Sequence, residues 1–267
     1  MHDCPERVSG PVTSGSRASW QGPAELVLVR HAESLGNVAD REARALGRGR
    51  LELNRRDPDV ELSETGLLQV EGLARHISSL KEAQRPTVVL SSPYRRAADT
   101  ARLAIDRSAL DLPVVLDERL RERELGVFDR MTRIGIRDAF PAEAERRQHV
   151  GKFYYRPPGG ESWCDVALRV RSLLSDIRFD YHRERVWVFT HQAVIMSFRL
   201  ALEGLDEQQL LDLDRQAPVA NCSLTTYRHD AAGKLVLASY DDSVALERAA
   251  APITHEPDRA GPPDALP

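Results

Sequence analysis

Four short apolar runs, each followed by a polar segment, constrain the fold of this chain more than any other feature. The runs are dense in Val and Leu and span Leu26–Val29, Thr87–Leu90, Pro113–Leu116 and Val186–Phe189. They are too short for buried helices, and a continuous apolar run of this length is typical of a strand that is covered on both faces. We therefore predict four buried β-strands.

Amphipathic helices separate these strands. After Ser63, apolar residues recur at spacings of three or four from Leu67 to Leu80, which predicts a helix with Ser63 as its N-cap. Residues 161–178 repeat the pattern and lead into the fourth strand. Strands that alternate with helices indicate a mostly parallel sheet with helices on both faces, so the expected fold is a three-layer α/β/α sandwich.

One domain accounts for most of the 267 residues. Residues 1–23 and 250–267 are rich in turn-forming residues and show no periodicity, so we expect both to be flexible tails of a domain that spans 24–249. Near the end of this domain, SLTTY and KLVLAS flank a polar turn at 230–233. This pattern predicts an antiparallel hairpin at the edge of the sheet.

Charge, hydropathy and cysteine content restrict the partners of the chain. With 37 basic and 41 acidic side chains, the net charge of −4 gives no general attraction to nucleic acid or to an anionic membrane. The apolar runs are far shorter than the roughly 20 residues that span a bilayer. The first ten residues lack the apolar stretch of a secretory signal, which predicts a cytoplasmic protein. Three cysteines without CxxC spacing predict reduced thiols rather than disulfides or a zinc site.

A candidate site follows from the polar residues at the strand ends. The four polar segments are Arg30–His31, Ser91–Arg96, Glu118–Glu122 and Thr190–His191. Ligands of open parallel sheets bind beyond the carboxyl ends of the strands, so we expect these segments to converge on one crevice. The sequence has no phosphate-cradling GxxxxGK[ST], no HExxH and no GxSxG motif.

The residue types in these segments fit phosphoryl transfer without a metal. Arginine donates paired hydrogen bonds to a phosphoryl dianion, and an unprotonated histidine is nucleophilic at neutral pH. A second histidine can stabilise charge on the transferring oxygens, while a protonated carboxyl group can protonate the leaving alkoxide. The residues therefore predict a phosphatase that uses neither a metal nor a cofactor.

Four motifs in order resemble those of the histidine phosphatase superfamily. The opening motif of the family is similar to LVLVRHAESLGN, with Ala32 where Gly is usual, and the later motifs resemble SSPYRRAADTA, RLRERELGVF and VFTHQAV. Further agreement comes from LSETGLLQ and PPGGESWCDVALRV. The resemblance runs from about Leu26 to Tyr227 and implies the phosphoglycerate mutase-like fold. It also implies an insert at about 127–160 that folds over the site.

The resemblance implies a role for six residues. His31 attacks phosphorus in line, Glu122 protonates the leaving group, and His191 stabilises the transferring oxygens before water releases phosphate from His31. The residues expected to bind the substrate phosphate are Arg30, Asn37 and Arg96.

Some of these assignments have alternatives. Glu118 and Glu124 lie close to Glu122 in the sequence, and any of the three could be a solvated turn residue, although the family register favours Glu122 as the acid. Asn37 could instead cap a helix. The arginine-rich segment 41–56 could attract an anionic substrate, but such runs are usually exposed faces.

The expected function is hydrolysis of a small phosphorylated metabolite through a phosphohistidine. The first alternative is a phosphoglycerate mutase-type transferase, which would rephosphorylate a second hydroxyl of the substrate. We do not find the proline-rich segment that mutases of the family carry between the acid and the second histidine, which favours hydrolysis. A non-catalytic binding module is the second alternative, and the intact catalytic positions argue against it. The expected partner is a small phosphorylated substrate, with no nucleic acid and no membrane, and a homodimer is compatible with the sequence.

Overall fold

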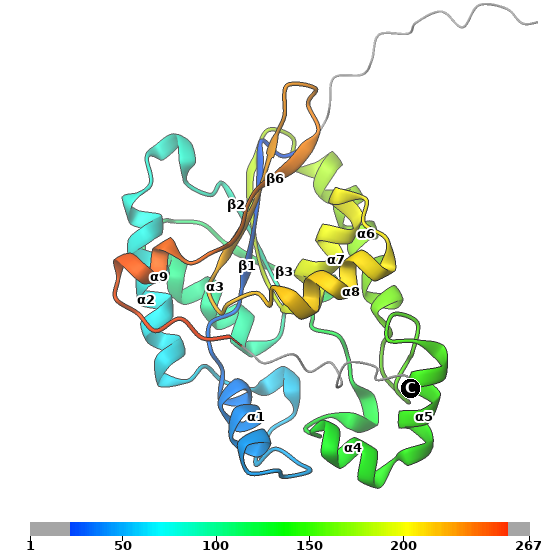
Figure 1. Ribbon diagram of the computed structural model, residues 1–267. Coiled ribbons are helices and arrows are strands. Elements are labelled where there is room, and N and C mark those ends of the chain that lie inside the picture. The colour runs from blue at the N-terminus through cyan, green and yellow to red at the C-terminus, as the bar shows by residue number, and fades with distance from the viewer. Residues whose placement is uncertain (1–21, 256–267) are drawn as a thin grey trace, which may run out of the picture.

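A six-stranded sheet lies at the centre of the structure, with helices on both faces (Figure 1). The computed structural model describes residues 22–255. The strands are β1 (Glu25–Arg30), β2 (Val88–Ser91), β3 (Val114–Leu116), β4 (Arg185–Thr190), β5 (Leu224–His229) and β6 (Leu235–Asp242). Their order in the sheet is β3-β2-β4-β1-β5-β6. The first four strands run parallel, which confirms the predicted α/β/α sandwich with a mostly parallel sheet.

The helices divide between the two faces of the sheet. The described part of the chain forms α1 (Leu35–Ala45), α2 (Glu64–Ser79), α3 (Arg95–Arg107), α4 (Arg133–Ala139), α5 (Pro141–Val150), α6 (Trp163–Asp180), α7 (Gln192–Glu203), α8 (Glu207–Gln216) and α9 (Val244–Arg248). Side chains of α2, α3 and α9 pack in one core, whereas side chains of α6, α7 and α8 pack in the other (Figure 1).

Alternate residues of β1 feed these two cores. Leu26 and Leu28 pack with α6 and α7, whereas Val27 and Val29 pack with α2 and α3. All four side chains are buried, and burial of such a side chain contributes about 1.5–3 kcal/mol relative to exposure. Burial on both faces explains why the strand is apolar without interruption.

Side-chain caps set where the two predicted helices begin. The hydroxyl of Ser63 accepts a hydrogen bond of 3.0 Å from the backbone N–H of Gly66, which confirms Ser63 as the N-cap of α2. The hydroxyl of Ser162 accepts from the backbone N–H of Asp165 at 3.1 Å, and the Asp165 carboxylate completes a capping box. Such caps contribute about 1 kcal/mol each and fix the register of the helix.

The predicted hairpin forms the antiparallel edge of the sheet. β5 pairs with β1, and β6 pairs with β5. The last strand continues to Asp242, beyond the segment KLVLAS that the sequence pattern marks. The hairpin is therefore confirmed, with a longer second strand.

The insert at 127–160 contains α4 and α5, which lie beyond the end of the sheet at which β1 gives way to α1 (Figure 1). Backbone bonds join the insert to the loop after α1. Leu51 N–H donates to Arg130 O at 2.9 Å, and Thr132 N–H donates to Gly49 O at 3.1 Å. The insert is thus attached to the chain that follows the RHAES motif.

The expected tails fall largely outside the described residues, which exclude 1–21 and 256–267. The start of the expected C-terminal tail is hydrogen-bonded to the domain. Backbone oxygen of Thr254 accepts from Asn221 N–H at 2.9 Å, and Oγ1 of Thr254 accepts from Nε2 of Gln69 at 2.8 Å. The described part of this segment therefore belongs to the packed structure.

Four arginines of the 41–56 segment pair with acidic neighbours. The pairs are Arg41–Glu33, Arg44–Asp40, Arg48–Glu52 and Arg55–Glu61. Glu33 and Asp40 are buried, whereas the other two pairs lie on the surface, where an ion pair contributes little to stability. All four pairs offset the positive charge locally. The arrangement agrees with the exposed-face alternative for this segment.

Candidate active site

Four of the residues predicted for the site lie close together beyond the carboxyl ends of the parallel strands. Arg30 ends β1, and His31 follows it. Arg96 lies in the first turn of α3, after β2, and His191 joins β4 to α7. The ring centroids of His31 and His191 are 5.1 Å apart, and Nε of Arg96 lies 3.3 Å from Nε2 of His31. The neighbouring strands β1, β4 and β2 thus deliver these buried side chains to one place.

Two partners fix the tautomer of His31. Nδ1 lies 2.8 Å from the backbone oxygen of Ala32, which can only accept, so Nδ1 carries the ring proton. On the other side of the ring, Nε of Arg96 donates to Nε2, and this bond requires a lone pair on Nε2. The neutral ring therefore presents an unprotonated nitrogen beside a guanidinium suited to phosphate, as a nucleophilic histidine requires.

Arg96 is held by Asp57 and Tyr94. Nη1 donates to the backbone oxygen and to one carboxylate oxygen of Asp57, at 2.8 and 3.1 Å, and Nη2 donates to the other carboxylate oxygen at 3.1 Å. The guanidinium carbon lies 5.3 Å from the centre of the Tyr94 ring, which in turn meets His191 edge-on. Asp57 comes from the loop between α1 and α2. A residue outside the family motifs therefore orients Arg96, which is predicted to bind the substrate phosphate.

His191 is completely buried. Burial lowers the pKa of His191 well below its ordinary value, and the positive charge of Arg96 lowers it further. Its Nε2 lies 2.8 Å from the hydroxyl of Ser92, and its Nδ1 has no hydrogen-bond partner in the described part of the chain. His191 is therefore neutral at pH 7, and a phosphoryl dianion beside it would raise its pKa, because negative charge favours the imidazolium.

Arg30 and Asn37 are both buried and both make structural bonds. Nη1 of Arg30 donates to the backbone oxygen of Val219. The amide oxygen of Asn37 accepts from the backbone N–H and the hydroxyl of Ser34, at 2.9 and 3.0 Å, in the capping box of α1. The capping alternative for Asn37 is thus realised through its oxygen, and these bonds leave its NH₂ group for another acceptor.

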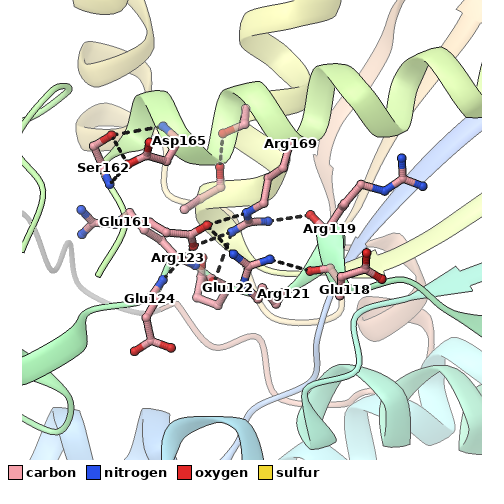
Figure 2. Close-up of polar contacts among 12 residues, drawn as sticks. Glu118, Arg119, Arg121, Glu122, Arg123, Glu124, Glu161, Ser162, Asp165 and Arg169 are labelled. Carbon is pink, nitrogen blue, oxygen red and sulfur yellow. Dashed lines mark hydrogen bonds and ion pairs between the residues drawn. The ribbon is translucent and has the colours of Figure 1, made fainter. Parts of the chain in front are cut away.

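Glu122 lies in a segment held by the partly buried ion pair between Glu161 and Arg169 (Figure 2). Nε and Nη2 of Arg169 contact the Glu161 carboxylate at 3.0 and 3.1 Å. Arg169 also donates to the backbone oxygens of Arg119 and Glu122, at 2.6 and 3.3 Å. The Glu161 carboxylate accepts from the backbone N–H of Glu124 at 3.1 Å. The segment PPGGESWCDVALRV therefore holds the backbone of the predicted acid through Glu161 and Arg169.

Two carboxylates of this segment, those of Glu122 and Glu124, act on Tyr94 beside His191. Oε2 of Glu124 is 3.5 Å from the hydroxyl of Tyr94, whose ring contacts His191. Burial is the main cause of the raised pKa of Tyr94, and the charges of Glu124 and Glu122 both add to it. The side chain of Glu118 lies on the opposite side of the cluster from that of Glu124 (Figure 2). Of the three glutamates considered for the acid, Glu122 and Glu124 are thus the two whose charges act on Tyr94.

A pocket adjoins the ion pair between Asp57 and Arg96. Its lining residues are Gly36, Leu51, Leu53, Asp57, Glu124, Leu125, Asp129, Arg130 and Met131. Residues 129–131 lie near the start of the expected insert, so this segment lines part of the pocket. Burial raises the pKa of Asp129, and the negative charges of Asp57 and Glu124 raise it further.

The described residues contain no metal-binding cluster. Within residues 22–255, no group of three or more His, Cys, Asp or Glu side chains could hold a metal ion. No helix in that range is long and apolar enough to cross a bilayer. Cys164 and Cys222 are free thiols, and burial raises the pKa of Cys222, whereas Cys4 lies outside the described residues. The positive charge beside His31 comes from Arg96.

Sequence analysis missed several residues that support the site. They are Asp57, Gln69, Ser92, Tyr94, Thr100 and Asn221. Gln69, Ser92, Tyr94 and Thr100 belong to segments that resemble family motifs, which was a usable signal. Asp57 stands in a loop rich in charged residues, where one acidic side chain looks like any other.

A model of the histidine phosphatase superfamily (branch 1) matches residues 26–242 of the chain. The chain belongs to this superfamily. The match covers the sheet and all four strand ends that carry the candidate site, and it confirms the resemblance seen in the motifs.

Relatives within the superfamily include named phosphatases. The chain is 31% identical over 183 residues to a metal-independent phosphoserine phosphatase of Arabidopsis thaliana, covering 67% of this chain and 68% of the relative. It is 32% identical over 241 residues to a bifunctional protein of Mycobacterium tuberculosis, covering 87% of this chain. The chain spans 57% of the length of that longer protein.

A solved structure of a mycobacterial glucosyl-3-phosphoglycerate phosphatase with inorganic phosphate has the same fold. It aligns with a TM-score of 0.62 at 25% identity, over 83% of this chain and 99% of that chain. The histidine phosphatase fold is therefore shown both by sequence and by structure.

Proposed function

We propose that the chain hydrolyses phosphomonoesters of small metabolites through a phosphohistidine at His31. The observation that carries the proposal is the orientation of His31, whose proton is held on Nδ1 by Ala32 O while Nε2 faces Arg96. The phosphatases among the relatives, named for phosphoserine and for glucosyl-3-phosphoglycerate, support a small phosphorylated substrate.

In the first step, Nε2 of His31 attacks phosphorus as the bond from phosphorus to the ester oxygen breaks. Arg30, Arg96 and the NH₂ group of Asn37 bind the phosphoryl oxygens. His191 takes up positive character as charge gathers on these oxygens, because the dianion favours its protonated form. Glu122 gives its proton to the leaving alkoxide and becomes a carboxylate.

In the second step, water replaces the alcohol. The Glu122 carboxylate removes a proton from water. The water oxygen bonds to phosphorus as the bond between phosphorus and Nε2 of His31 breaks. Inorganic phosphate leaves, and both His31 and Glu122 return to their starting protonation states. The two steps use the same residues in reversed roles, so no metal is needed to activate water.

The proposal is tested with purified protein, p-nitrophenyl phosphate and a panel of alkyl phosphates. We expect release of inorganic phosphate in the presence of excess EDTA, and a labelled intermediate that is lost in acid and survives alkali. His31→Ala should abolish both turnover and label, because no other side chain can attack from that position. Turnover by this variant, or activity that EDTA removes and a divalent metal restores, would overturn the mechanism.

The same samples distinguish hydrolysis from mutase chemistry. With 2- or 3-phosphoglycerate, a hydrolase releases inorganic phosphate, whereas a mutase moves the phosphate to the neighbouring hydroxyl. We expect phosphate release without interconversion of the two isomers. Rapid interconversion with little phosphate release would favour the mutase.

A further inference from the structure

One peptide unit next to the nucleophile carries hydrogen bonds on both of its sides. This unit joins Ala32 to Glu33, so it contains the carbonyl of Ala32 and the N–H of Glu33. Its carbonyl accepts the proton of His31 Nδ1 at 2.8 Å. Its N–H lies in the same plane and points in the opposite direction, where it donates to Oε1 of Gln69 at 2.8 Å. Because a peptide unit is planar, Gln69 also sets the direction of the carbonyl that holds the proton of His31.

The amide of Gln69 is itself oriented by the segment that follows α9. Its Nε2 donates to the backbone oxygen of Pro252 at 2.9 Å and to Oγ1 of Thr254 at 2.8 Å. These two acceptors require the NH₂ group on their side, and so they keep Oε1 facing Glu33. Gln69 is completely buried, and a flipped amide would set its NH₂ group against the N–H of Glu33.

A second chain of bonds runs from Thr254 back to His31. The hydroxyl of Thr254 donates to Oδ1 of Asn221 at 3.0 Å. Nδ2 of Asn221 donates to the backbone oxygen of His31 at 2.9 Å. One hydroxyl therefore accepts from Gln69 and donates to Asn221, and the two amides tether the chain on both sides of Ala32.

We propose that the segment after α9 positions the nucleophile through the backbone oxygen of Pro252 and the hydroxyl of Thr254, with Thr254 and Gln69 as positioning residues. Thr254 and Pro252 hold the amide of Gln69, and this amide holds the peptide unit whose carbonyl keeps the proton of His31 on Nδ1. The segment thereby keeps the lone pair of Nε2 directed at phosphorus. The proposal rests on the nucleophilic role of His31 in the proposed function.

Removal of the Thr254 hydroxyl breaks both chains at their shared atom. Oδ1 of Asn221 then loses its donor from Thr254, and the NH₂ group of Gln69 keeps only the backbone oxygen of Pro252 as an acceptor. The Ala32–Glu33 peptide unit gains freedom to rotate, and the other tautomer of His31, which has its proton on Nε2 and cannot attack, becomes populated. Because the hydroxyl makes two hydrogen bonds, we expect its loss to lower kcat about tenfold, with little change in KM.

The experiment compares Thr254→Val, Thr254→Ser and the control Ile253→Val in the full chain. Val matches Thr in size and lacks the hydroxyl, whereas Ser keeps the hydroxyl. Ile253 is 40% exposed and lies in the same segment. Three quantities are measured for each protein: kcat and KM, the unfolding midpoint, and the ring ¹⁵N chemical shifts of His31, assigned with His31→Gln.

The expected result is a lower kcat for Thr254→Val at a temperature far below its unfolding midpoint, with ring ¹⁵N shifts that move toward the other tautomer. Thr254→Ser and Ile253→Val should match the wild type in both. Unchanged ring shifts in Thr254→Val would overturn the proposal. This holds if kcat is unchanged, and also if kcat falls because part of the variant protein is unfolded. The ring shifts decide the matter even if the wild type proves inactive, so failure of the proposed function is recognised separately.

Discussion

Asp57 occupies one edge of the guanidinium of Arg96 and leaves the other edge facing His31. The carboxylate takes one hydrogen bond from each of Nη1 and Nη2, while Nε–H points at Nε2 of His31. The edge formed by Nε–H and the second Nη2–H thus faces His31, where the proposed mechanism requires phosphorus to lie. In the proposed mechanism, the ion pair therefore orients Arg96 for phosphate rather than competing with it.

Asp57→Asn tests this orientation. The amide keeps the size of the side chain, but it replaces one acceptor oxygen with a donor that opposes the guanidinium. We expect kcat/KM to fall roughly tenfold, in line with about 1.5 kcal/mol for a hydrogen bond to a charged group. Asp59→Asn is the matched control, because Asp59 is exposed in the same short helix, Asp57–Asp59. Equal rates for Asp57→Asn and the wild type would contradict the orienting role.

The lowered pKa of His191 predicts a dependence of stability on pH. The unfolded chain binds a proton at this residue below pH about 6.5, whereas the folded protein resists protonation because the ring is buried beside Arg96. The free energy of unfolding should therefore fall as the pH drops from about 6.5 to 5, since the unfolded state binds more protons there. Denaturant titrations across this range measure the effect.

His191→Gln isolates the contribution of this residue. His76 also has its pKa lowered, chiefly by burial, so it contributes a slope of the same sign in the wild type. The variant should retain the slope due to His76 and lose the part due to His191. Parallel curves for wild type and variant would show that His191 does not titrate differently in the folded and unfolded states.

The sheet was predictable because its signal is repeated along the chain. β1 is buried on both faces, so nearly every residue in it is apolar, and the strand ends carry the charged motif residues. The placement of Arg30, His31, Arg96 and His191 at one edge then follows from parallel order alone.

The supports of the site left no such pattern. α5 has no buried residue, so its sequence lacks the apolar periodicity that predicts a helix. Thr254 lies in a Pro-containing segment whose composition predicts a tail. In the structure, hydrogen bonds between its hydroxyl group and the side chains of Gln69 and Asn221 hold it in place. Asp57 reaches Arg96 across 39 positions of the chain, and no local feature of a sequence records such a pairing.

The ion pair between Glu161 and Arg169 is partly buried, so it should contribute more to stability than an exposed pair. Glu161→Gln leaves Arg169 without its charged partner and weakens the bond from Glu124 N–H. We expect a loss of about 2 kcal/mol in the free energy of unfolding, since removal of one partner strands a charge that is largely shielded from water. Chemical denaturation at pH 7 measures it.

Glu71→Gln is the control for this effect. Glu71 pairs with Arg75 on the surface of α2, where both side chains are well exposed, and such pairs change stability by less than about 1 kcal/mol. Similar losses for the two variants would show that Glu161 contributes no more than a surface pair.

The identity of the general acid can be decided by the leaving group. A general acid accelerates departure of a basic alkoxide strongly, whereas nitrophenolate leaves readily without a proton. Glu122→Gln keeps the size of the side chain and removes the transferable proton. We therefore expect it to slow hydrolysis of an alkyl phosphate by roughly 10²–10⁴ while affecting p-nitrophenyl phosphate much less.

Glu124→Gln and Glu118→Gln complete the comparison. Glu124 is included because its carboxylate lies 3.5 Å from the hydroxyl of Tyr94, whose ring contacts His191. Glu124→Gln should change both substrates by a similar small factor, since its carboxylate borders the pocket beside Asp57. Glu118→Gln should leave both rates near the wild-type values. If the loss depends on the leaving group in Glu124→Gln and not in Glu122→Gln, the general acid is Glu124 rather than Glu122. Equal loss on both substrates in Glu122→Gln would instead assign Glu122 to binding, because only proton transfer distinguishes an alkoxide from a nitrophenolate.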